Sequence, residues 1–254
     1  MAKKIISLMP EHKNYLEPFA GSLAVFFNKE KVLCETINDC DGRLINLYRQ
    51  IRENPEELAE LVSLTPYARE EFECSKETSS DELEDARRMM TMLWCSIGGK
   101  TTNNTSFRIN KTWRGPYNTQ TWSKIPSRIL EATNRLKDAQ IEHRNALQLI
   151  SENSDPETLI YIDPPYLPET LSGSYYKYEM STEEHEKLLS ILCESKSKII
   201  LSGYDSELYN SYLKELNWKK IIIPTQNFTG KKSDEVLWIN YEYHGQQLDL
   251  FSMI

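Results

Sequence analysis

The sequence lacks the features that mark secreted, membrane-bound or metal-binding proteins. No segment approaches the run of about 18 apolar residues that a membrane span requires, and MAKKIISLMPEHK has too few apolar residues before Pro10 for a signal peptide. The five cysteines are scattered, without a Cys-x-x-Cys pair and without histidines at metal-ligand spacing. These absences predict a cytoplasmic protein with reduced thiols, no membrane partner and no bound metal.

An excess of positive charge is also lacking. The chain has 30 basic and 38 acidic residues, which give a formal net charge of -8. On average this argues against a nucleic-acid partner, but a single basic face or loop is enough to bind one. With 254 residues, the chain can bury a core as one large α/β domain or as a domain with a sizeable insertion.

Strand-like and helix-like segments alternate along most of the chain. Helical patterns cover 41–53, 181–195 and 205–216, and Ser181 followed by Glu184 is typical of a capping box. The alternation predicts βαβ units in a mainly parallel sheet, with the last two strands paired as an antiparallel hairpin. The segments typical of strands are 14–19, 31–39, 139–145, 158–163, 196–203, 218–224 and 235–241.

Between about residues 54 and 138 the pattern changes to helix, loop and helix without a convincing strand, which indicates an inserted domain. Its centre, 98–122, contains no acidic residue and has interleaved aromatic residues. The loop is therefore either a local electropositive patch that binds nucleic acid or an ordinary solvated loop, and composition alone leaves both open. Its basic residues are Lys100, Arg108, Lys111 and Arg114.

In an open parallel sheet, ligands bind beyond the carboxyl ends of the strands, so the residues there are candidates for a site. After the first strand, EPFAGSLAVFF predicts a turn at Gly21 that opens a helix near Ser22 and allows close backbone approach by a ligand. It does not match the dinucleotide pattern G-x-G-x-x-G. Asp39 ends the second strand, where it could hold the hydroxyls of a ribose or cap the helix that follows.

The strand at 158–163 ends in Asp-Pro-Pro-Tyr, the most specific motif in the chain. Neither proline has an N–H, so the turn is rigid and its carbonyls remain available as acceptors. Asp163 adds a carboxylate acceptor, and Tyr166 adds a flat face on which a base can stack. This set suits a planar ligand with an amino group, whereas a purely structural turn would explain the prolines but not the acid and the aromatic ring.

Together, EPFAGS, IND before LINLY, the basic loop, and IDPPY followed by ILSGY resemble the adenine-specific DNA methyltransferases of the phage and restriction-modification type, in the order of their alpha group. The resemblance implies a Rossmann-like methyltransferase fold: a mainly parallel seven-stranded sheet with a C-terminal antiparallel hairpin, plus an inserted, mostly helical target-recognition domain. The implied parts are residues 1–53 and 139–244 for catalysis, 54–138 for target recognition, and 245–254 as a tail.

The same resemblance implies methyl transfer from S-adenosyl-L-methionine to the 6-amino group of adenine in double-stranded DNA, with the base flipped out. Asp39 would hold the cofactor ribose, Asn145 would lie near the cofactor adenine, and Asp163 would lie close to both cofactor and base. Asp163 and the Pro164 carbonyl, next to Pro165, would accept hydrogen bonds from the target amine, with Tyr166 stacked on the base. The cofactor-binding turn would comprise Glu17, Pro18, Phe19, Ala20, Gly21 and Ser22.

Two alternatives remain open at this point. The family usually carries a Gly-Gly-Lys segment before the first helix, and this sequence opens directly on AKKIISLMPEHK. The amino terminus could be truncated, cofactor binding could be weak, as in a DNA-binding relative, or Lys3 or Lys4 could substitute. The chemistry could also act on the 4-amino group of cytosine or on protein glutamine, although Asp163 at the first position of the turn favours adenine.

The carboxyl-terminal tail has its own pattern. Gln247, Leu248, Leu250 and Phe251 resemble the short peptide with which bacterial replication and repair proteins bind the sliding clamp of DNA polymerase. Such a peptide inserts apolar anchors into a pocket. The other interpretation is a tail that folds back onto its own protein.

Overall fold

The computed structural model describes residues 1–97, 105–109, 117–170, 177–224 and 234–242. The remaining segments contain Lys100, Lys111 and Arg114 of the predicted DNA-binding loop and all four residues of the predicted clamp-binding tail. Those predictions therefore lie outside the described residues.

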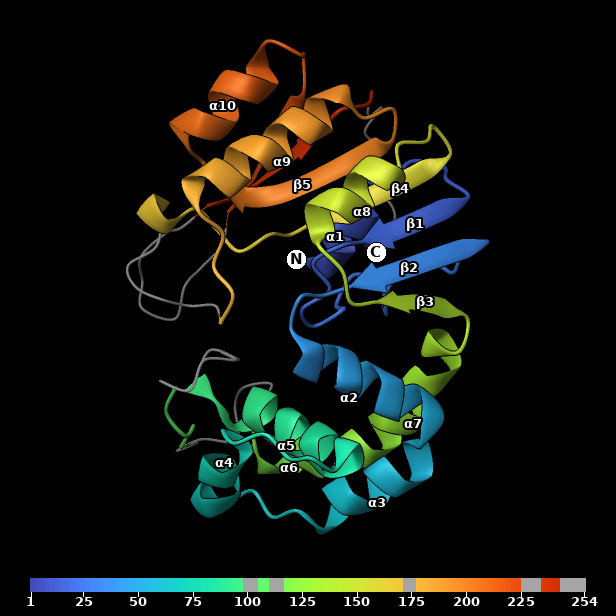
Figure 1. Ribbon diagram of the computed structural model, residues 1–254, viewed down its shortest axis with the longest axis vertical. Coiled ribbons are helices and arrows are strands. Elements are labelled where there is room, and N and C mark those ends of the chain that lie inside the picture. The colour runs from blue at the N-terminus through green and yellow to red at the C-terminus, as the bar shows by residue number, and fades with distance from the viewer. Residues whose placement is uncertain (98–104, 110–116, 171–176, 225–233, 243–254) are drawn as a thin grey trace, which may run out of the picture.

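The described residues form one seven-stranded sheet in the order β3-β2-β1-β4-β5-β7-β6 (Figure 1). Neighbouring strands are parallel except β7, which is antiparallel to both β5 and β6. This confirms the predicted Rossmann-like sheet and its antiparallel hairpin. The strands are β1 (Asn14–Glu17), β2 (Cys34–Asn38), β3 (Ala139–Glu142), β4 (Thr158–Ile162), β5 (Lys198–Tyr204), β6 (Lys219–Ile223) and β7 (Glu235–Ile239).

Side chains alternate between the two faces of the sheet, so each strand contributes to two cores. Tyr15 and Leu159 belong to the core on one face, whereas Leu16 and Ile160 belong to the core on the other. The second core is covered by α8 (Ala146–Glu152), α9 (Thr182–Glu194) and α10 (Glu207–Lys214) (Figure 1). The first is shared with the short α1 (Ala2–Ile6) and with the helical lobe.

A lobe of helices lies beyond the β3 edge of the sheet (Figure 1). Within the predicted segment 54–138, the described residues form helices and one isolated bridge, Ser96 with Phe107, and they include no strand, as the sequence pattern predicted. α2 packs against α5 and α7, which joins it to the lobe as well as to the sheet. The helices are α2 (Gly42–Glu53), α3 (Pro55–Leu64), α4 (Arg69–Ser75), α5 (Glu82–Cys95), α6 (Thr119–Trp122) and α7 (Ile125–Leu136).

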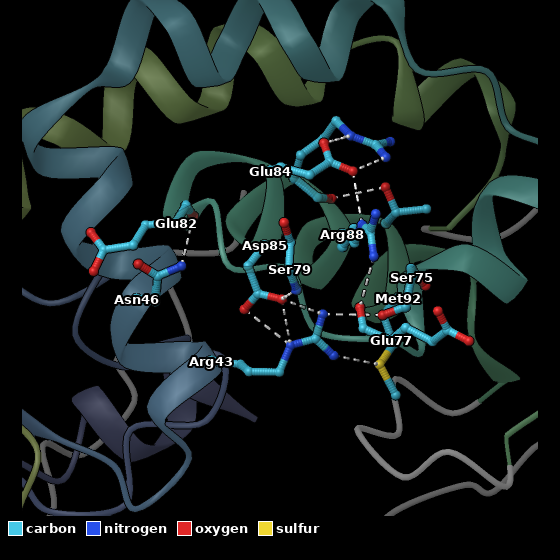
Figure 2. Close-up of polar contacts among 12 residues, drawn as sticks. Arg43, Asn46, Ser75, Glu77, Ser79, Glu82, Glu84, Asp85, Arg88 and Met92 are labelled. Carbon is cyan, nitrogen blue, oxygen red and sulfur yellow. Dashed lines mark hydrogen bonds and ion pairs between the residues drawn. The ribbon is translucent and has the colours of Figure 1, made fainter.

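A nearly buried ion pair fastens α2 to α5 (Figure 2). The Arg43 Nε donates to both carboxylate oxygens of Asp85 at 3.2 Å, and its Nη2 donates to the Ser75 carbonyl at 3.1 Å. Asp85 also accepts from the backbone N–H of Ser79 at 3.0 Å. The side chains of Arg43 and Asp85 are 11% and 9% exposed, so each charge depends on the other for compensation.

Two local predictions were wrong. Residues 21–29 form a series of turns rather than a helix, because Gly21 (φ +48°) and Leu23 (φ +54°) have left-handed backbone conformations that interrupt a right-handed helix. β3 ends at Glu142 rather than at Asn145, since Asn145 is the N-cap of α8 and its side chain accepts from the Gln148 N–H at 3.1 Å. The capping box of Ser181 and Glu184 at the start of α9 is confirmed.

Candidate active site

The site lies where the strand order reverses. β1 pairs with β2 on one side and with β4 on the other, so the chain crosses in opposite directions from this point and leaves a crevice at the carboxyl ends. A cavity of about 1000 Å³ opens there. It is lined by residues from the three strand ends at which the sequence predicted a site: Phe19, Gly21, Ser22, Asp39, Asp163 and Pro165.

Asp39 organises the turn after β1. One carboxylate oxygen accepts from the Gly21 N–H at 3.0 Å and the other from the Asp41 N–H at 2.9 Å. The Tyr48 hydroxyl donates to the Gly21 carbonyl. Of the two interpretations of Asp39, the ribose contact remains compatible with this geometry, since each carboxylate oxygen keeps acceptor capacity, whereas the helix cap is wrong. The cap of α2 is Asp41, not Asp39, because the Asp41 side chain accepts from the Arg43 N–H at 3.0 Å.

Asn38 is a structural residue of the site that the sequence analysis missed. Its fully buried amide donates to the Pro18 carbonyl at 2.9 Å and to the Arg144 carbonyl at 3.2 Å. Its oxygen accepts from the Arg144 N–H at 2.8 Å. One side chain thus connects the ends of β1, β2 and β3. The available signal was an amide side chain directly before Asp39 at the carboxyl end of a strand.

Asp163 follows β4 with its carboxylate accessible from the cavity. Hydroxyl groups of Tyr161, Tyr166 and Ser202 hydrogen-bond to it and favour the charged form. Desolvation by the surrounding protein outweighs them and raises the pKa of Asp163 to about 6. The Tyr166 ring packs edge-on against Tyr204, with 4.6 Å between centroids, which fixes its orientation beside the carboxylate.

Glu17 lies behind the cavity instead of in its lining. It is 2% exposed and accepts a hydrogen bond from the Tyr15 hydroxyl at 2.8 Å. Burial, together with the nearby charge of Asp163, raises the pKa of Glu17 to about 8, so the carboxyl group is mostly protonated at neutral pH.

Of the other predicted cofactor residues, Pro18 and Ala20 contribute through their backbone, whereas Asn145 lies outside the cavity lining. Pro18 accepts from Asn38 through its carbonyl, and the Ala20 N–H donates to the Asn38 carbonyl at 2.8 Å, so both shape the turn through the backbone. Asn145 is exposed, caps α8 and is not among the residues that line the cavity.

The raised pKa of Asp163 gives a pH dependence. If the carboxylate must accept hydrogen bonds, the active fraction falls below about pH 6, and we expect kcat/KM to decrease by about tenfold per pH unit there. A profile of initial rates from pH 4.5 to 8.5, with folding followed by circular dichroism at each pH, checks this. A limb centred near pH 4 would show that the pKa of Asp163 is not raised in the active enzyme.

The helical lobe contributes an aromatic and cationic wall to the same cavity, which we name the lobe wall: Trp94, Tyr117 and Arg128. Trp94 and Tyr117 pack edge-on with 4.9 Å between centroids, and the exposed Arg128 guanidinium lies 5.8 Å from the Trp94 ring. The sequence analysis missed Trp94 and Arg128, because Trp94 precedes the basic loop at 98–122 and Arg128 follows it, so no local pattern connects them.

Arg108 is the one predicted DNA-binding residue among those described. Its Nε and Nη2 both donate to the Ser96 carbonyl, at 3.1 and 2.6 Å, and its guanidinium lies 4.4 Å from the Tyr117 ring. The side chain therefore joins Ser96 to Arg108 and supports the lobe wall. Its predicted contact with DNA remains untested.

Metal-binding and membrane-spanning features are absent from the described part of the chain. No group of three or more histidine, cysteine, aspartate or glutamate residues there is placed to hold a metal ion. Every helix among these residues is too short or too polar to span a bilayer.

Comparison with known proteins gives the family. The chain is 33% identical to the Type II methyltransferase M1.LlaDCHI of Lactococcus lactis subsp. cremoris, over 92% of this chain and 89% of the relative. It is 26% identical to the Type II methyltransferase M.MjaIII of Methanocaldococcus jannaschii, over 90% of this chain and 89% of that relative. A solved SAM-dependent methyltransferase from Agrobacterium tumefaciens is 10% identical, with a TM-score of 0.37 over 94% of this chain and 60% of that structure. The family model of D12 class N6 adenine-specific DNA methyltransferases matches residues 1–228, and the chain therefore belongs to that family of enzymes.

Proposed function

We propose that the protein transfers a methyl group from S-adenosylmethionine to the 6-amino group of an adenine that is flipped out of double-stranded DNA. The observation that supports this most directly is the Asp163 carboxylate at the switch point, next to the Pro164 carbonyl and the ring of Tyr166. Family membership supports methyl transfer and a DNA substrate.

The cavity suits the cofactor in size and charge. Its volume of about 1000 Å³ is at the upper end of the usual range for ligand pockets. Four carboxylates line it, Asp39, Asp41, Glu131 and Asp163. The three that lie at the strand ends, Asp39, Asp41 and Asp163, complement a ligand that carries a positive sulfonium and an amino group. Gly21 and Ser22 offer close backbone approach, and Asp39 is placed to accept from ribose hydroxyls. When bound, S-adenosylmethionine supplies an electrophilic methyl group.

The residues of the Asp-Pro-Pro-Tyr turn would prepare the target amine. The lone pair of an aromatic amine is delocalised into the ring, so the amine is a poor nucleophile. Acceptors at Asp163 and at the Pro164 carbonyl favour a pyramidal amine and stabilise the positive charge that develops on it during attack. The methylated amine would then pass one proton to solvent, directly or through the Asp163 carboxylate, and Tyr166 would hold the base by stacking so that the reacting atoms stay in line.

Reaching this cavity requires the adenine to leave the duplex, at a cost of a few kcal/mol for unstacking. The lobe wall faces the same cavity and combines aromatic faces with a cation, the chemistry that offsets such a cost by contacts to phosphates and bases. We propose that DNA lies between Asp163 and the lobe wall, with the basic loop contributing further phosphate contacts.

Incubation with labelled S-adenosylmethionine and mixed-sequence duplex DNA, followed by digestion to nucleosides and mass spectrometry, tests the reaction. We expect 6-methyladenine. A product of 4-methylcytosine would instead support the cytosine alternative. Measurable DNA binding without any methylated base would support a catalytically weak relative. Base flipping is tested separately, because 2-aminopurine at the target position should become more fluorescent in the complex.

Arg128→Ala is expected to weaken duplex binding by about fivefold to tenfold and to reduce the slope of log K against log salt by about 1, because one phosphate contact is lost. Cofactor affinity should change less than twofold. Arg52→Ala is the matched control: Arg52 pairs with Glu53 in the same lobe, outside the cavity lining. Fluorescence anisotropy over a salt series measures both variants, and an unchanged slope for Arg128→Ala would contradict the proposed DNA path.

The proposed interaction of the tail with a sliding clamp is supported by the sequence pattern of Gln247, Leu248, Leu250 and Phe251. Such a tether would raise the effective concentration of the enzyme on replicating DNA.

A further inference from the structure

Residues 21–29, which follow β1, form part of the cavity wall through Ala24 and Phe27 among others. Two residues of this segment, Gly21 and Leu23, have left-handed backbone conformations. Such a conformation is unfavourable for a residue with a side chain, so at Leu23 it persists only because surrounding contacts hold it. The fold must therefore supply contacts that keep the segment in shape.

Three charged residues supply such contacts, and we name them the anchor triad: Lys29, Glu35 and Arg135. The side chain of Glu35, in β2, is 1% exposed, and that of Lys29, the last residue of the segment, is 2% exposed. Glu35 accepts from the Lys29 ammonium and from both Nη atoms of Arg135, with Nη2 at 3.1 Å from Oε1. The Lys29 ammonium also donates to the Glu30 carbonyl at 2.7 Å. The end of the segment is thereby tied to β2.

Arg135, in the last turn of α7, makes a second and direct contact with the segment. Its Nη2 donates to the carbonyl of the fully buried Phe26 at 2.9 Å, and its guanidinium lies 4.4 Å from the Phe26 ring. The planar guanidinium has enough donors to bind a carboxylate and a carbonyl at once. One side chain of the helical lobe therefore holds the segment at Phe26 and, through Glu35, at Lys29.

Arg135 lines the cavity as well, on the same helix as Arg128 of the lobe wall. Loss of its guanidinium would take one donor from the Phe26 carbonyl and leave Glu35 with Lys29 as its remaining charged partner. Both acceptors are buried, so their desolvation would no longer be fully compensated. The segment would then open locally to bring them into contact with water.

We propose that Arg135 is a positioning residue for cofactor binding: through Phe26 and Glu35 it holds residues 21–29 in the conformation that shapes the cavity wall. The inference rests on the proposed function, because it assumes that S-adenosylmethionine binds against this segment. It also gives α7, a helix of the predicted target-recognition domain, a function in the cofactor site.

Arg135→Met tests the proposal, since it removes the guanidinium and keeps a long apolar side chain. If the segment then adopts its binding conformation about one-tenth of the time, the Kd for S-adenosylmethionine rises about tenfold. Bound cofactor selects the ordered conformation, so kcat at saturating cofactor should stay within about twofold of the wild-type value. Calorimetric titration and initial rates measure the two quantities. A lower kcat with an unchanged Kd would overturn the proposal.

Arg87→Met is the matched control that separates positioning from folding. Arg87 is another nearly buried arginine of the lobe, 12% exposed against 20% for Arg135, and it pairs with Glu71 and Glu84 outside the cavity lining. Both variants should lower the melting temperature, but only Arg135→Met should weaken cofactor binding. Arg135→Lys should give an intermediate Kd, because lysine keeps the charge beside Glu35 and lacks the planar fork. Equal Kd values for Arg135→Met and Arg87→Met would overturn the proposal.

Hydrogen exchange followed by mass spectrometry tests the anchor without any cofactor. In Arg135→Met we expect faster exchange in 21–29, including the N–H groups of Phe27 and Lys29, which each donate within the segment at 3.0 Å. In Arg87→Met the segment should exchange as in the wild type. Unchanged exchange of 21–29 in Arg135→Met would overturn the proposal. A wild-type protein that binds no S-adenosylmethionine would instead overturn the proposed function, so the two failures are distinguishable.

Discussion

Asp163→Asn is expected to lower kcat by about 100-fold to 1000-fold, the usual loss when one preorganised group that stabilises developing charge is removed. The amide has the shape of the carboxylate but no charge, so it stabilises the developing positive charge on the amine less well. Cofactor affinity should change by less than about tenfold, because Asp39 and the turn at Gly21 remain in place. Single-turnover methylation together with calorimetric titration of the cofactor separates the two effects.

Asp138→Asn is a suitable control for this experiment. Asp138 is an exposed carboxylate paired with Lys31, directly before β3 and therefore at the opposite end of the strands from the site. Its substitution should leave kcat unchanged. Wild-type kcat in Asp163→Asn would rule out the carboxylate as the acceptor for the target amine. A loss of cofactor binding as large as the loss of kcat would assign Asp163 mainly to the cofactor.

Asp85→Ala is expected to reduce the free energy of unfolding by about 3–5 kcal/mol, because it leaves the Arg43 guanidinium nearly buried without its counter-charge. The Ser79 N–H loses its acceptor as well (Figure 2). Denaturation in urea at 25 °C, monitored by tryptophan fluorescence, gives the difference. The pair of the exposed Glu73 with the partly buried Lys76 provides the comparison, and Glu73→Ala should cost less than about 1 kcal/mol.

A double substitution tests the physical reason for this loss. Replacing both partners, as in Arg43→Met with Asp85→Leu, removes the unpaired charge and should recover most of the stability lost in Asp85→Ala. If the double variant is as unstable as Asp85→Ala, the loss arises from the Ser79 turn or from packing, rather than from an uncompensated charge. The contacts of Arg43 with Ser75 and Met92 make it the more interconnected partner.

The sequence alone determined the strands, their mainly parallel direction, the terminal hairpin and the cap of α9. Each of these depends on local periodicity or on a few neighbouring residues. It also identified Asp39 and Asp163 as residues at strand ends. In a parallel sheet the carboxyl ends meet at one edge, so a local signal and a general rule of topology together predicted a site there.

Tertiary structure decided what these rules leave open. Leu23 adopts a left-handed conformation inside a segment that reads as a helix, and Asn145 caps α8 instead of lining the cavity. The lobe wall joins residues that are distant in the chain. The raised pKa values of the buried Glu17 and of Asp163 at the cavity arise from desolvation by the folded protein. Propensity and spacing describe near neighbours, whereas burial, charge compensation and cavity shape arise when distant segments pack together.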